Sequence, residues 1–255
     1  MLAIISPSKG QNFDKENEGL VYSQPELLDH SLELLNELKK LSIEDIGSLM
    51  SVSDKIAELN YNRFAQFHTP FDINNAKQAI FAFKGDVYTG FSLDNYSEEN
   101  FSYAQKHLRI LSGFYGLLKP MDLIQAYRLE MKTKLANEKG KDLYQFWDNI
   151  ITEKLQTALK DQGDQVLVNL ASNEYFKAIK KKSLDAKIIT PVFKEKKGDI
   201  YKVIALFAKK ARGLMSDYII RNEINDLDGL KAFDREGYIF NESLSKNNEL
   251  VFTRG

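Results

Sequence analysis

The chain reads Leu108-Arg-Ile-Leu-Ser-Gly-Phe-Tyr-Gly-Leu-Leu-Lys-Pro-Met-Asp-Leu-Ile-Gln-Ala-Tyr-Arg-Leu-Glu-Met131 in the stretch that says most about its fold. Apolar residues dominate the first positions, and this strand-like run ends at Ser112-Gly113. A four-residue Gly-x-x-Gly turn follows, and after it come an apolar pair, Lys119 and Pro120. Short apolar runs on both sides of a glycine turn are typical of two core segments that are joined tightly.

The same turn also suits a contact with phosphate. Glycines at positions 113 and 116 lack a Cβ, so backbone N–H groups there can approach an anion closely. Arg109, Lys119 and Arg128 surround the turn with positive charge. Such a hairpin fits a nucleic-acid backbone contact that reads no bases; a tight turn between two core segments is the alternative, and most Gly-x-x-Gly turns bind nothing.

Composition limits the class of protein. The 255 residues are 43% hydrophobic and 28% charged, which is typical of a soluble globular protein with one large core or two small ones. No apolar run is long enough to span a membrane, and the first residues lack the basic region of a signal peptide. Cysteine is absent, which fits a cytoplasmic protein. The net charge of -1 means that a nucleic-acid partner needs a local basic patch.

Helical and strand-like segments alternate along the chain, which predicts one mixed α/β domain over residues 1–255, with a central sheet and surrounding helices. Ser42 and Asp45 form a capping-box pattern. The predicted strands cover residues 2–7, 79–83, 165–170, 187–193 and 201–207, with a hairpin across 195–199 and further apolar pieces at 238–240 and 250–252. The predicted helices cover residues 24–40, 54–67, 97–107, 142–160 and 211–222.

Two groups of polar residues near the predicted strands could carry chemistry. Lys9 follows the first strand in Ser6-Pro-Ser-Lys9, at the kind of strand end where α/β folds bind ligands. Lys84, Asp86 and Tyr88 place a cation, a carboxylate and a phenol around Gly85, so they could bind phosphate and supply a general acid or base. An ordinary strand exit and a Gly-Asp turn explain the same residues.

Two further groups follow later in the chain. Asn169, Ser172 and Glu174 lie at the end of a predicted strand, where Ser172 would cap a helix or a polar ligand would dock. Lys209, Lys210 and Arg212 lie after the predicted strand 201–207, where the start of a helix would favour phosphate. A solvated charge run is the alternative for these cations. The three histidines are scattered, so we expect no metal site, and no motif implies a cofactor.

Several motifs in one order resemble the YaaA peroxide-stress protein family, and the match covers essentially the whole chain. In that family the first motif usually continues Ser-Pro-Ala-Lys-Thr-Leu, whereas Ser8 and Gly10 stand here, which removes the threonine hydroxyl. The motifs are Ile4-Ile-Ser-Pro-Ser-Lys9, Lys84-Gly-Asp-Val-Tyr-Thr-Gly90, Leu111-Ser-Gly-Phe-Tyr-Gly-Leu-Leu-Lys-Pro120, Tyr127-Arg-Leu-Glu-Met131, Gly140-Lys-Asp-Leu-Tyr-Gln-Phe-Trp147, Val168-Asn-Leu-Ala-Ser172 and Phe207-Ala-Lys-Lys-Ala-Arg-Gly213.

The resemblance implies a cytoplasmic bacterial protein that protects against hydrogen peroxide by limiting iron-dependent damage. It also implies a compact α/β fold, a positively charged cleft that binds DNA, and a helix–hairpin–helix element, which maps onto the turn from Gly113 to Gly116. It implies no specific enzymatic activity. DNA is therefore the expected partner, without a membrane, and the oligomeric state stays open.

Two hypotheses about function follow. In the first, the protein binds DNA by its backbone and shape, through Lys9, Arg109, Gly113, Gly116, Lys119, Arg128, Lys209, Lys210 and Arg212. In the second, it is an enzyme that acts on a nucleotide or on damaged DNA, with catalytic candidates Lys9, Lys84, Asp86, Tyr88 and Glu130. Both require cations to converge on one cleft, and the set that we expect there is Lys9, Lys84, Arg109, Arg128, Lys209 and Arg212. Carboxylates paired with cations in that cleft would favour the enzyme.

Overall fold

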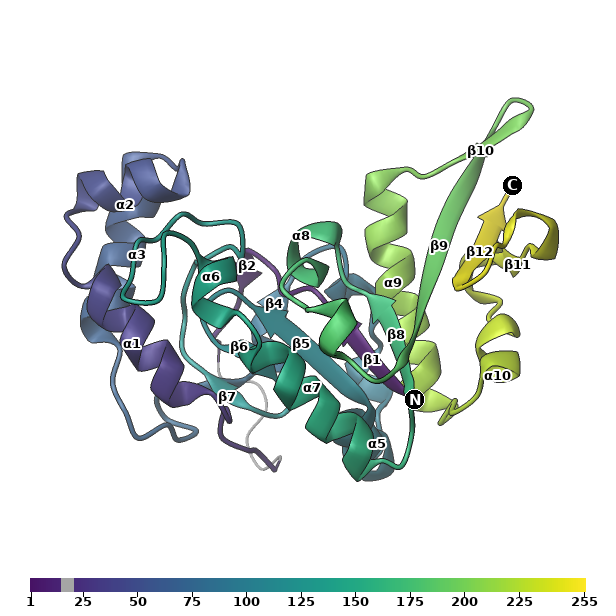
Figure 1. Cartoon of the computed structure of the whole chain (residues 1–255), viewed down its shortest axis with the longest axis horizontal. Coiled ribbons are helices and arrows are strands. Elements are labelled where there is room, and N and C mark those ends of the chain that lie inside the picture. The colour runs from purple at the N-terminus through teal and green to yellow at the C-terminus, as the bar shows by residue number, and fades with distance from the viewer. Residues whose placement is uncertain (15–20) are drawn as a thin grey trace.

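Strand β1 (Leu2–Ile5) is the centre of the fold, and it lies inside a mainly parallel sheet of eight strands (Figure 1). The computed structural model describes residues 1–14 and 21–255. All four residues of β1 are buried, because the run Leu-Ala-Ile-Ile has no polar face to turn toward water. A parallel strand with two buried faces needs cover on both sides of the sheet.

The strands of this sheet follow the order β11-β12-β9-β8-β1-β5-β6, and β10 pairs with β9 outside that path. Two small sheets pair β2 with β4 and β3 with β7, each antiparallel. The remaining strands are β2 Gly10–Gln11, β3 Lys77–Gln78, β4 Phe83–Lys84, β5 Leu108–Ser112, β6 Gly116–Leu118, β7 Leu123–Ile124, β8 Val166–Leu170, β9 Lys187–Lys197, β10 Ile200–Lys202, β11 Ile239–Phe240 and β12 Glu249–Arg254.

Helices cover the sheet and form a separate lobe. The α-helices are α1 Leu28–Leu38, α2 Ile43–Met50, α3 Asp54–Gln66, α4 Ala79–Ala82, α5 Glu98–His107, α6 Leu143–Trp147, α7 Ile150–Asp161, α8 Asn173–Phe176, α9 Ala205–Arg221 and α10 Leu227–Lys231. Short 3-10 helices lie at η1 Tyr88–Gly90, η2 Leu93–Asn95, η3 Lys181–Ser183, η4 Arg235–Gly237 and η5 Glu242–Leu244. Within the described residues, no helix is long and apolar enough to cross a membrane.

Helices α5 and α9 contact each other and β1, whereas α7 crosses in front of β5 (Figure 1). Helices α1, α2 and α3 make the lobe at the left, and the long hairpin of β9 and β10 projects at the right. The mixed α/β architecture with a central sheet is therefore confirmed.

The chain leaves β1 between two parallel neighbours, β5 on one side and β8 on the other. The chain runs from β1 to β5 on one side and from β8 to β9 on the other, so the carboxyl ends of β1 and β8 flank a topological switch point. Ligands in open α/β sheets bind in the crevice outside such strand ends. At this edge Ser6 follows β1, Ala171 follows β8, and Ser112 is the last residue of β5.

Three predicted elements are wrong. Residues 79–82 form the helical turn α4, and only Phe83 of the predicted strand 79–83 lies in a strand, β4, because backbone hydrogen bonds from Ala79 and Ile80 to the carbonyls of Asp122 and Pro120 hold the turn in place. The predicted helix 142–160 is broken into α6 and α7 at Asp148, whose φ is 33°. The predicted strand 201–207 ends at Lys202, and α9 begins at Ala205.

The segment on which the helix–hairpin–helix element was mapped is also different. Strands β5 and β6 pair antiparallel, with Ser112 opposite Gly116, so residues 108–118 form a β-hairpin. The strand-like pattern of 108–112 is thus confirmed, and the helical element does not occur there. The reason lies in the sequence, since this apolar run is buried on both faces as the neighbour of β1.

Candidate nucleic-acid interface

The centre of the candidate site is an ion pair just beyond the carboxyl end of β1. The Nζ atom of Lys9 lies 2.6 Å from Oε1 of Glu130. The Glu130 side chain is only 15% exposed, whereas that of Lys9 is 58% exposed. Gln11 also joins these two segments of the chain, because its side chain accepts a hydrogen bond from the backbone N–H of Tyr127 at 3.1 Å. Strand β2 and residues 127–130 therefore share one surface.

Strands β2 and β4 bring Lys84 beside this pair. Gly10 lies opposite Lys84 in the register, and the Ser8 hydroxyl donates a hydrogen bond to the Lys84 carbonyl. Gly85 continues with a φ of +134°, and a Cβ on it would lie 2.6 Å from the Ser8 hydroxyl oxygen. Only glycine fits this turn, which carries the chain from Lys84 to Asp86.

Helix α9 adds the next cations. The Nζ atom of Lys209 lies 3.6 Å from Oδ2 of Asp86, so α9 and the end of β4 meet here. Arg212 lies one turn further along the helix, on the same side as Lys209. It is half-buried without an acidic partner among the described residues, and burial lowers the pKa of its guanidinium. Lys210 turns elsewhere, because it pairs with Glu236 at 2.5 Å.

The placement of these cations differs from the prediction. Because α9 begins at Ala205, Lys209, Lys210 and Arg212 lie inside the helix and not at a strand-to-helix junction. The positive end of the helix dipole is confined to the first turn, so it does not reinforce a phosphate site at Arg212.

Two arginines lie at the other end of the surface. Burial lowers the pKa of Arg63 on α3, and repulsion from Arg128 lowers it further. Among the described residues neither arginine has an acidic partner, and the buried Nε of Arg128 has no hydrogen-bond partner. The Arg63 guanidinium donates only a long hydrogen bond of 3.4 Å to Asn60. Sequence reasoning missed Arg63, because nothing in the sequence around it distinguishes it from any other charged residue on a helix.

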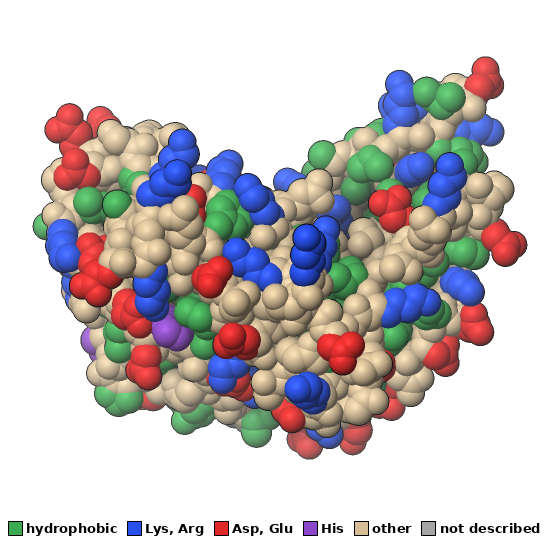
Figure 2. Space-filling model, viewed as in Figure 1, with side chains coloured by type: hydrophobic (Ala, Val, Ile, Leu, Met, Phe, Trp, Pro, Cys, Tyr) green, Lys and Arg blue, Asp and Glu red, His purple; other side chains and the backbone are tan. Residues whose placement is uncertain are grey.

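These contacts define a cationic row, which consists of Arg63, Arg128, Lys9, Lys84, Lys209 and Arg212. The row contains two carboxylates, those of Glu130 and Asp86. Figure 2 shows Lys and Arg side chains around a hollow between the lobe of α1–α3 and the projecting β9–β10 hairpin. Strands β2 and β4 and the start of α9 lie beneath that hollow in Figure 1.

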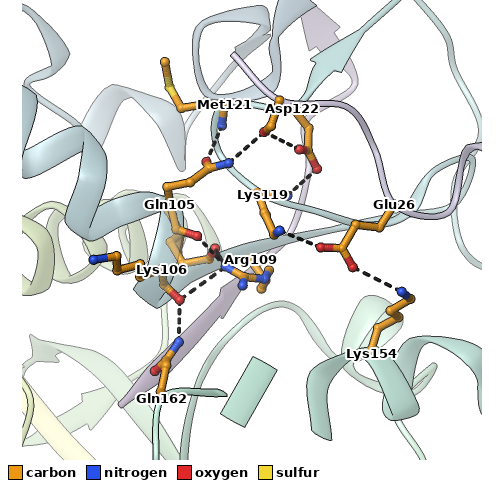
Figure 3. A network of polar contacts seen from close by, with 11 residues as sticks. Glu26, Gln105, Lys106, Arg109, Lys119, Met121, Asp122, Lys154 and Gln162 are labelled. Carbon is orange, nitrogen blue, oxygen red and sulfur yellow. Dashed lines mark hydrogen bonds and ion pairs between the residues drawn. The ribbon is translucent and has the colours of Figure 1, made fainter. Parts of the chain in front are cut away.

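Arg109 and Lys119 lie in a different place, at the amino ends of the parallel strands (Figure 3). The Arg109 guanidinium donates to the backbone carbonyls of Gln105, Lys106 and Leu108. Its side chain is thus buried against the end of α5, and burial lowers its pKa. The prediction that Arg109 converges with the other five cations is wrong, because Arg109 starts β5 while the row follows the opposite strand ends.

Lys119 belongs to the same network as Arg109. Its Nζ atom lies 2.5 Å from Glu26, which also pairs with Lys154 at 3.2 Å. The buried carboxylate of Asp122 accepts hydrogen bonds from the Lys119 backbone at 2.7 Å and from the Ser23 hydroxyl at 2.6 Å. Burial raises the pKa of Asp122 to about 6 despite these bonds.

Gly113 and Gly116 are buried, so the turn does not present its backbone to a ligand. Trp147 donates a hydrogen bond from Nε1 to the Gly113 carbonyl at 3.0 Å. A Cβ on Gly113 would overlap the Leu129 carbonyl oxygen, and one on Gly116 would lie 2.7 Å from the Trp147 ring. The structural explanation of this turn therefore holds, and the expected phosphate contact there is corrected.

The remaining catalytic candidates differ in exposure. Tyr88 is buried and donates a hydrogen bond to the Ser6 carbonyl at 3.1 Å. Burial raises the pKa of its phenol well above the ordinary value, so Tyr88 stays protonated. Glu174 accepts from the Lys132 backbone at 3.3 Å. Within the described residues, no three His, Asp or Glu side chains group closely enough to hold a metal ion.

The cap and strand-end residues have clear structural partners. Ser172 precedes α8, but its side chain makes no cap bond, and its backbone N–H donates to the Ser6 hydroxyl at 2.9 Å. Asn169 accepts from the Ala171 backbone at 3.1 Å. These bonds join the ends of β1 and β8 beneath the cationic row.

Comparison with known proteins agrees with this architecture over the whole chain. The family model described as peroxide stress protein YaaA matches residues 1–244. A UPF0246 protein of Psychromonas ingrahamii is 58% identical over 254 residues, covering 100% of this chain and 99% of the relative. UPF0246 proteins of Alteromonas mediterranea and Colwellia psychrerythraea are 56% and 54% identical, covering 100% of this chain and 98% and 99% of the relatives. The chain belongs to the peroxide stress protein YaaA family.

Proposed function

We propose that this protein is a cytoplasmic DNA-binding protein of the peroxide-stress response, and that it limits iron-dependent oxidative damage. The observation that carries the DNA-binding part is the cationic row. Six cations from five chain segments follow one surface with only two carboxylates, although the whole chain has a net charge of -1. A hollowed face on which cations outnumber carboxylates, in a protein with almost no net charge, favours an extended anion.

The types of residue favour backbone contacts over base reading. Arginine and lysine neutralise phosphates and release condensed counterions, which gives affinity without sequence preference. Arg63 and Arg128 form the part of the row where two guanidinium groups repel each other, so a phosphate between them would relieve the repulsion. Lys84, Lys209 and Arg212 continue the charge on the other side of the Lys9–Glu130 pair.

Affinity for a duplex oligonucleotide at several salt concentrations tests the proposal. The double variant Lys84→Ala/Lys209→Ala should bind less tightly, and the slope of log K against log salt should fall by about 2, since each phosphate contact contributes close to 1. Lys210→Ala is the matched control, because Lys210 lies next to Lys209 but pairs with Glu236. An unchanged slope in the double variant, or an equal loss in the control, would refute the proposed interface.

The link to iron needs its own measurement. Plasmid DNA exposed to ferrous iron and hydrogen peroxide acquires strand breaks, which convert supercoiled plasmid to the open circular form. If bound protein limits this damage, the parent should protect the plasmid and the Lys84→Ala/Lys209→Ala variant should protect it less. Equal protection by both proteins would separate the peroxide function from DNA binding.

One observation favours a second candidate, an enzyme that acts on a nucleotide or on damaged DNA. The Glu130 carboxylate is mostly buried and lies at the switch point of the sheet, paired with Lys9. A simple phosphate groove gains nothing from a carboxylate, whereas a general acid and base need such a pair. Asp86 beside Lys209 adds a second carboxylate at the same surface.

Glu130→Gln distinguishes the two candidates. In a binding protein, loss of the negative charge should raise DNA affinity, because one repulsive group leaves the row. In an enzyme, the same change should abolish turnover of its substrate. Duplexes that carry 8-oxoguanine or an abasic site, incubated with parent and variant and analysed for cleavage, provide the assay. Higher affinity together with no cleavage by the parent would reject the enzyme for these substrates.

A further inference from the structure

An exposed hydrophobic surface lies on the projecting hairpin beside the cationic row. We call residues 194–207 the arm; it comprises the outer part of β9, all of β10, the link and the first turn of α9. Ile200, Val203 and Leu206 in the arm are 52%, 54% and 58% exposed. Large apolar side chains with half their surface in water, within seven consecutive residues, mark an interaction site more often than a random surface does.

The arm is anchored at its base and free at its tip. At the base, the buried Glu195 pairs with Arg254 at 2.8 Å and accepts a hydrogen bond from Tyr238. The Arg254 guanidinium lies 4.9 Å from the centre of the Phe207 ring, so it packs on one part of that aromatic residue, which stays 40% exposed. The apolar side chains nearer the tip are not part of the buried core. Figure 1 shows the hairpin extending beyond the rest of the molecule.

Charge on the arm indicates what the apolar surface meets. Lys196, Lys197 and Lys202 are exposed there, against one exposed acid, Asp199. Leu206 precedes Lys209 by three residues on α9, so the apolar surface joins the end of the cationic row. Figure 2 shows hydrophobic and basic side chains together on this side of the hollow. An apolar surface framed by lysines and continuous with a phosphate-binding row complements DNA better than it complements an apolar protein face.

We infer that the arm inserts Val203 and Leu206 between base pairs of a duplex held on the cationic row, and so bends the DNA. This inference rests on the proposed function. Proteins that bend DNA in this way combine basic residues on the phosphates with apolar side chains that unstack one base step. A rigid base and an exposed apolar tip meet the mechanical requirement for such a wedge, since the side chains must push against a fixed support.

A duplex with fluorophores at both ends and 2-aminopurine inside reports bending and unstacking in one sample. Bound parent protein should shorten the end-to-end distance and raise the 2-aminopurine fluorescence. The variant Val203→Ser/Leu206→Ser should bind about tenfold more weakly, because base contacts with apolar side chains are lost, and it should leave the duplex straight. Ile239→Ser is the matched control, since Ile239 is 67% exposed on β11, away from the row.

The outcomes separate this inference from the proposed function. Binding by the parent without bending or unstacking overturns the wedge but leaves the DNA interface standing. Absence of any duplex binding by the parent overturns the interface itself. A dimer of the parent that the double variant dissociates, measured by sedimentation, shows that a second copy covers the arm and also overturns the wedge. Circular dichroism and the thermal midpoint show whether the variants are folded.

Discussion

A Cβ added to Gly213 would test how α9 is held against the candidate interface. Gly213 faces Gly90 of η1, and the two backbones meet without side chains between them. A Cβ on Gly213 would overlap the Val87 carbonyl oxygen and lie 2.8 Å from its carbon. One on Gly90 would lie 2.6 Å from the Gly213 carbonyl carbon. Both obstacles are backbone atoms, which cannot rotate away as a side chain can.

The expected cost follows from this geometry. Carbon atoms pack best at roughly 3.5–4.0 Å, so Gly213→Ala forces α9 and η1 apart by about 1 Å. Such overpacking costs roughly 1–3 kcal/mol, and a backbone clash places it at the upper end. The better helix propensity of alanine returns about 1 kcal/mol. We therefore expect Gly213→Ala to lower the free energy of unfolding by about 2 kcal/mol, or the thermal midpoint by roughly 4–8 °C for a chain of this length.

Gly47→Ala is the matched control, because it makes the same change inside α2. There the new Cβ would lie 3.5 Å from the Ala57 Cβ, an ordinary contact. The variant should therefore gain roughly 0.5–1 kcal/mol from helix propensity. Urea denaturation and differential scanning calorimetry measure both variants. If Gly213→Ala is as stable as Gly47→Ala, the close approach of α9 and η1 is refuted, and with it the support that brings Lys209 to Asp86.

Two further changes test other parts of the structure. Gly113→Ala should lower the free energy of unfolding by about 1–3 kcal/mol, since its Cβ would lie 3.0 Å from the Glu130 carbonyl carbon. The protein that remains folded should keep its DNA affinity. A loss of DNA affinity in the folded variant would show that the turn belongs to the interface. Burial raises the pKa of Asp122 from 3.8 to about 6, so between these values the folded state binds the proton that the unfolded state has lost. The stability of the parent relative to Asp122→Asn should fall as pH rises from about 4 to about 6, by on the order of 3 kcal/mol, and equal pH slopes in urea denaturation would contradict the buried carboxyl.

The sequence predicts those elements whose pattern is complete within a few residues. Ser42 and Asp45 form the predicted capping box, with the serine side chain accepting from the Asp45 backbone and the carboxylate accepting from the Ser42 backbone. The apolar run of β1 and the alternation that buries Ile189 and Phe193 in β9 likewise follow from local sequence, whereas β9 continues to Lys197 and includes Glu195, which the sequence placed in the turn. Periodicity and caps are local signals, so no tertiary information is needed to find them.

Elements fixed by distant contacts could not be predicted. Ala79 and Ile80 donate backbone hydrogen bonds to the carbonyls of Asp122 and Pro120, about forty residues away, and this holds an apolar run in a helical turn. Asp148 has a φ of 33° in the middle of a pattern that is helical on both sides. Tertiary packing overrides propensity in both cases.

In the candidate site, too, some placements follow from local sequence and others depend on the tertiary structure. Lys9 follows the end of β1 and Lys84 ends β4 before Gly85, and their contacts place them beside Glu130 and β2, whereas Lys209 reaches Asp86 from inside α9. Arg109 satisfies the same local rule, yet it begins its strand, which sends its side chain to the opposite edge of the sheet. A cation at the amino end of a parallel strand lies at one edge of the sheet, and a cation at the carboxyl end lies at the other. The length of an apolar run does not show at which end of the strand a neighbouring cation will lie.

The Lys9–Glu130 pair divides the cationic row, and this division lets both proposed functions use one surface. Glu130 neutralises Lys9 at 2.6 Å, and Asp86 partly neutralises Lys209 at 3.6 Å. Among the described residues, the cations of the row without an acidic partner are therefore those on either side of the pair: Arg63, Arg128, Lys84 and Arg212. In the proposed DNA complex these unpaired cations would contribute most of the affinity, because a cation without an acidic partner can neutralise a phosphate and release the counterion condensed on it. In the proposed complex, phosphates held on both sides would place the intervening nucleotide over Glu130, the carboxylate of the row that is mostly shielded from water, which is where the proposed enzyme would act.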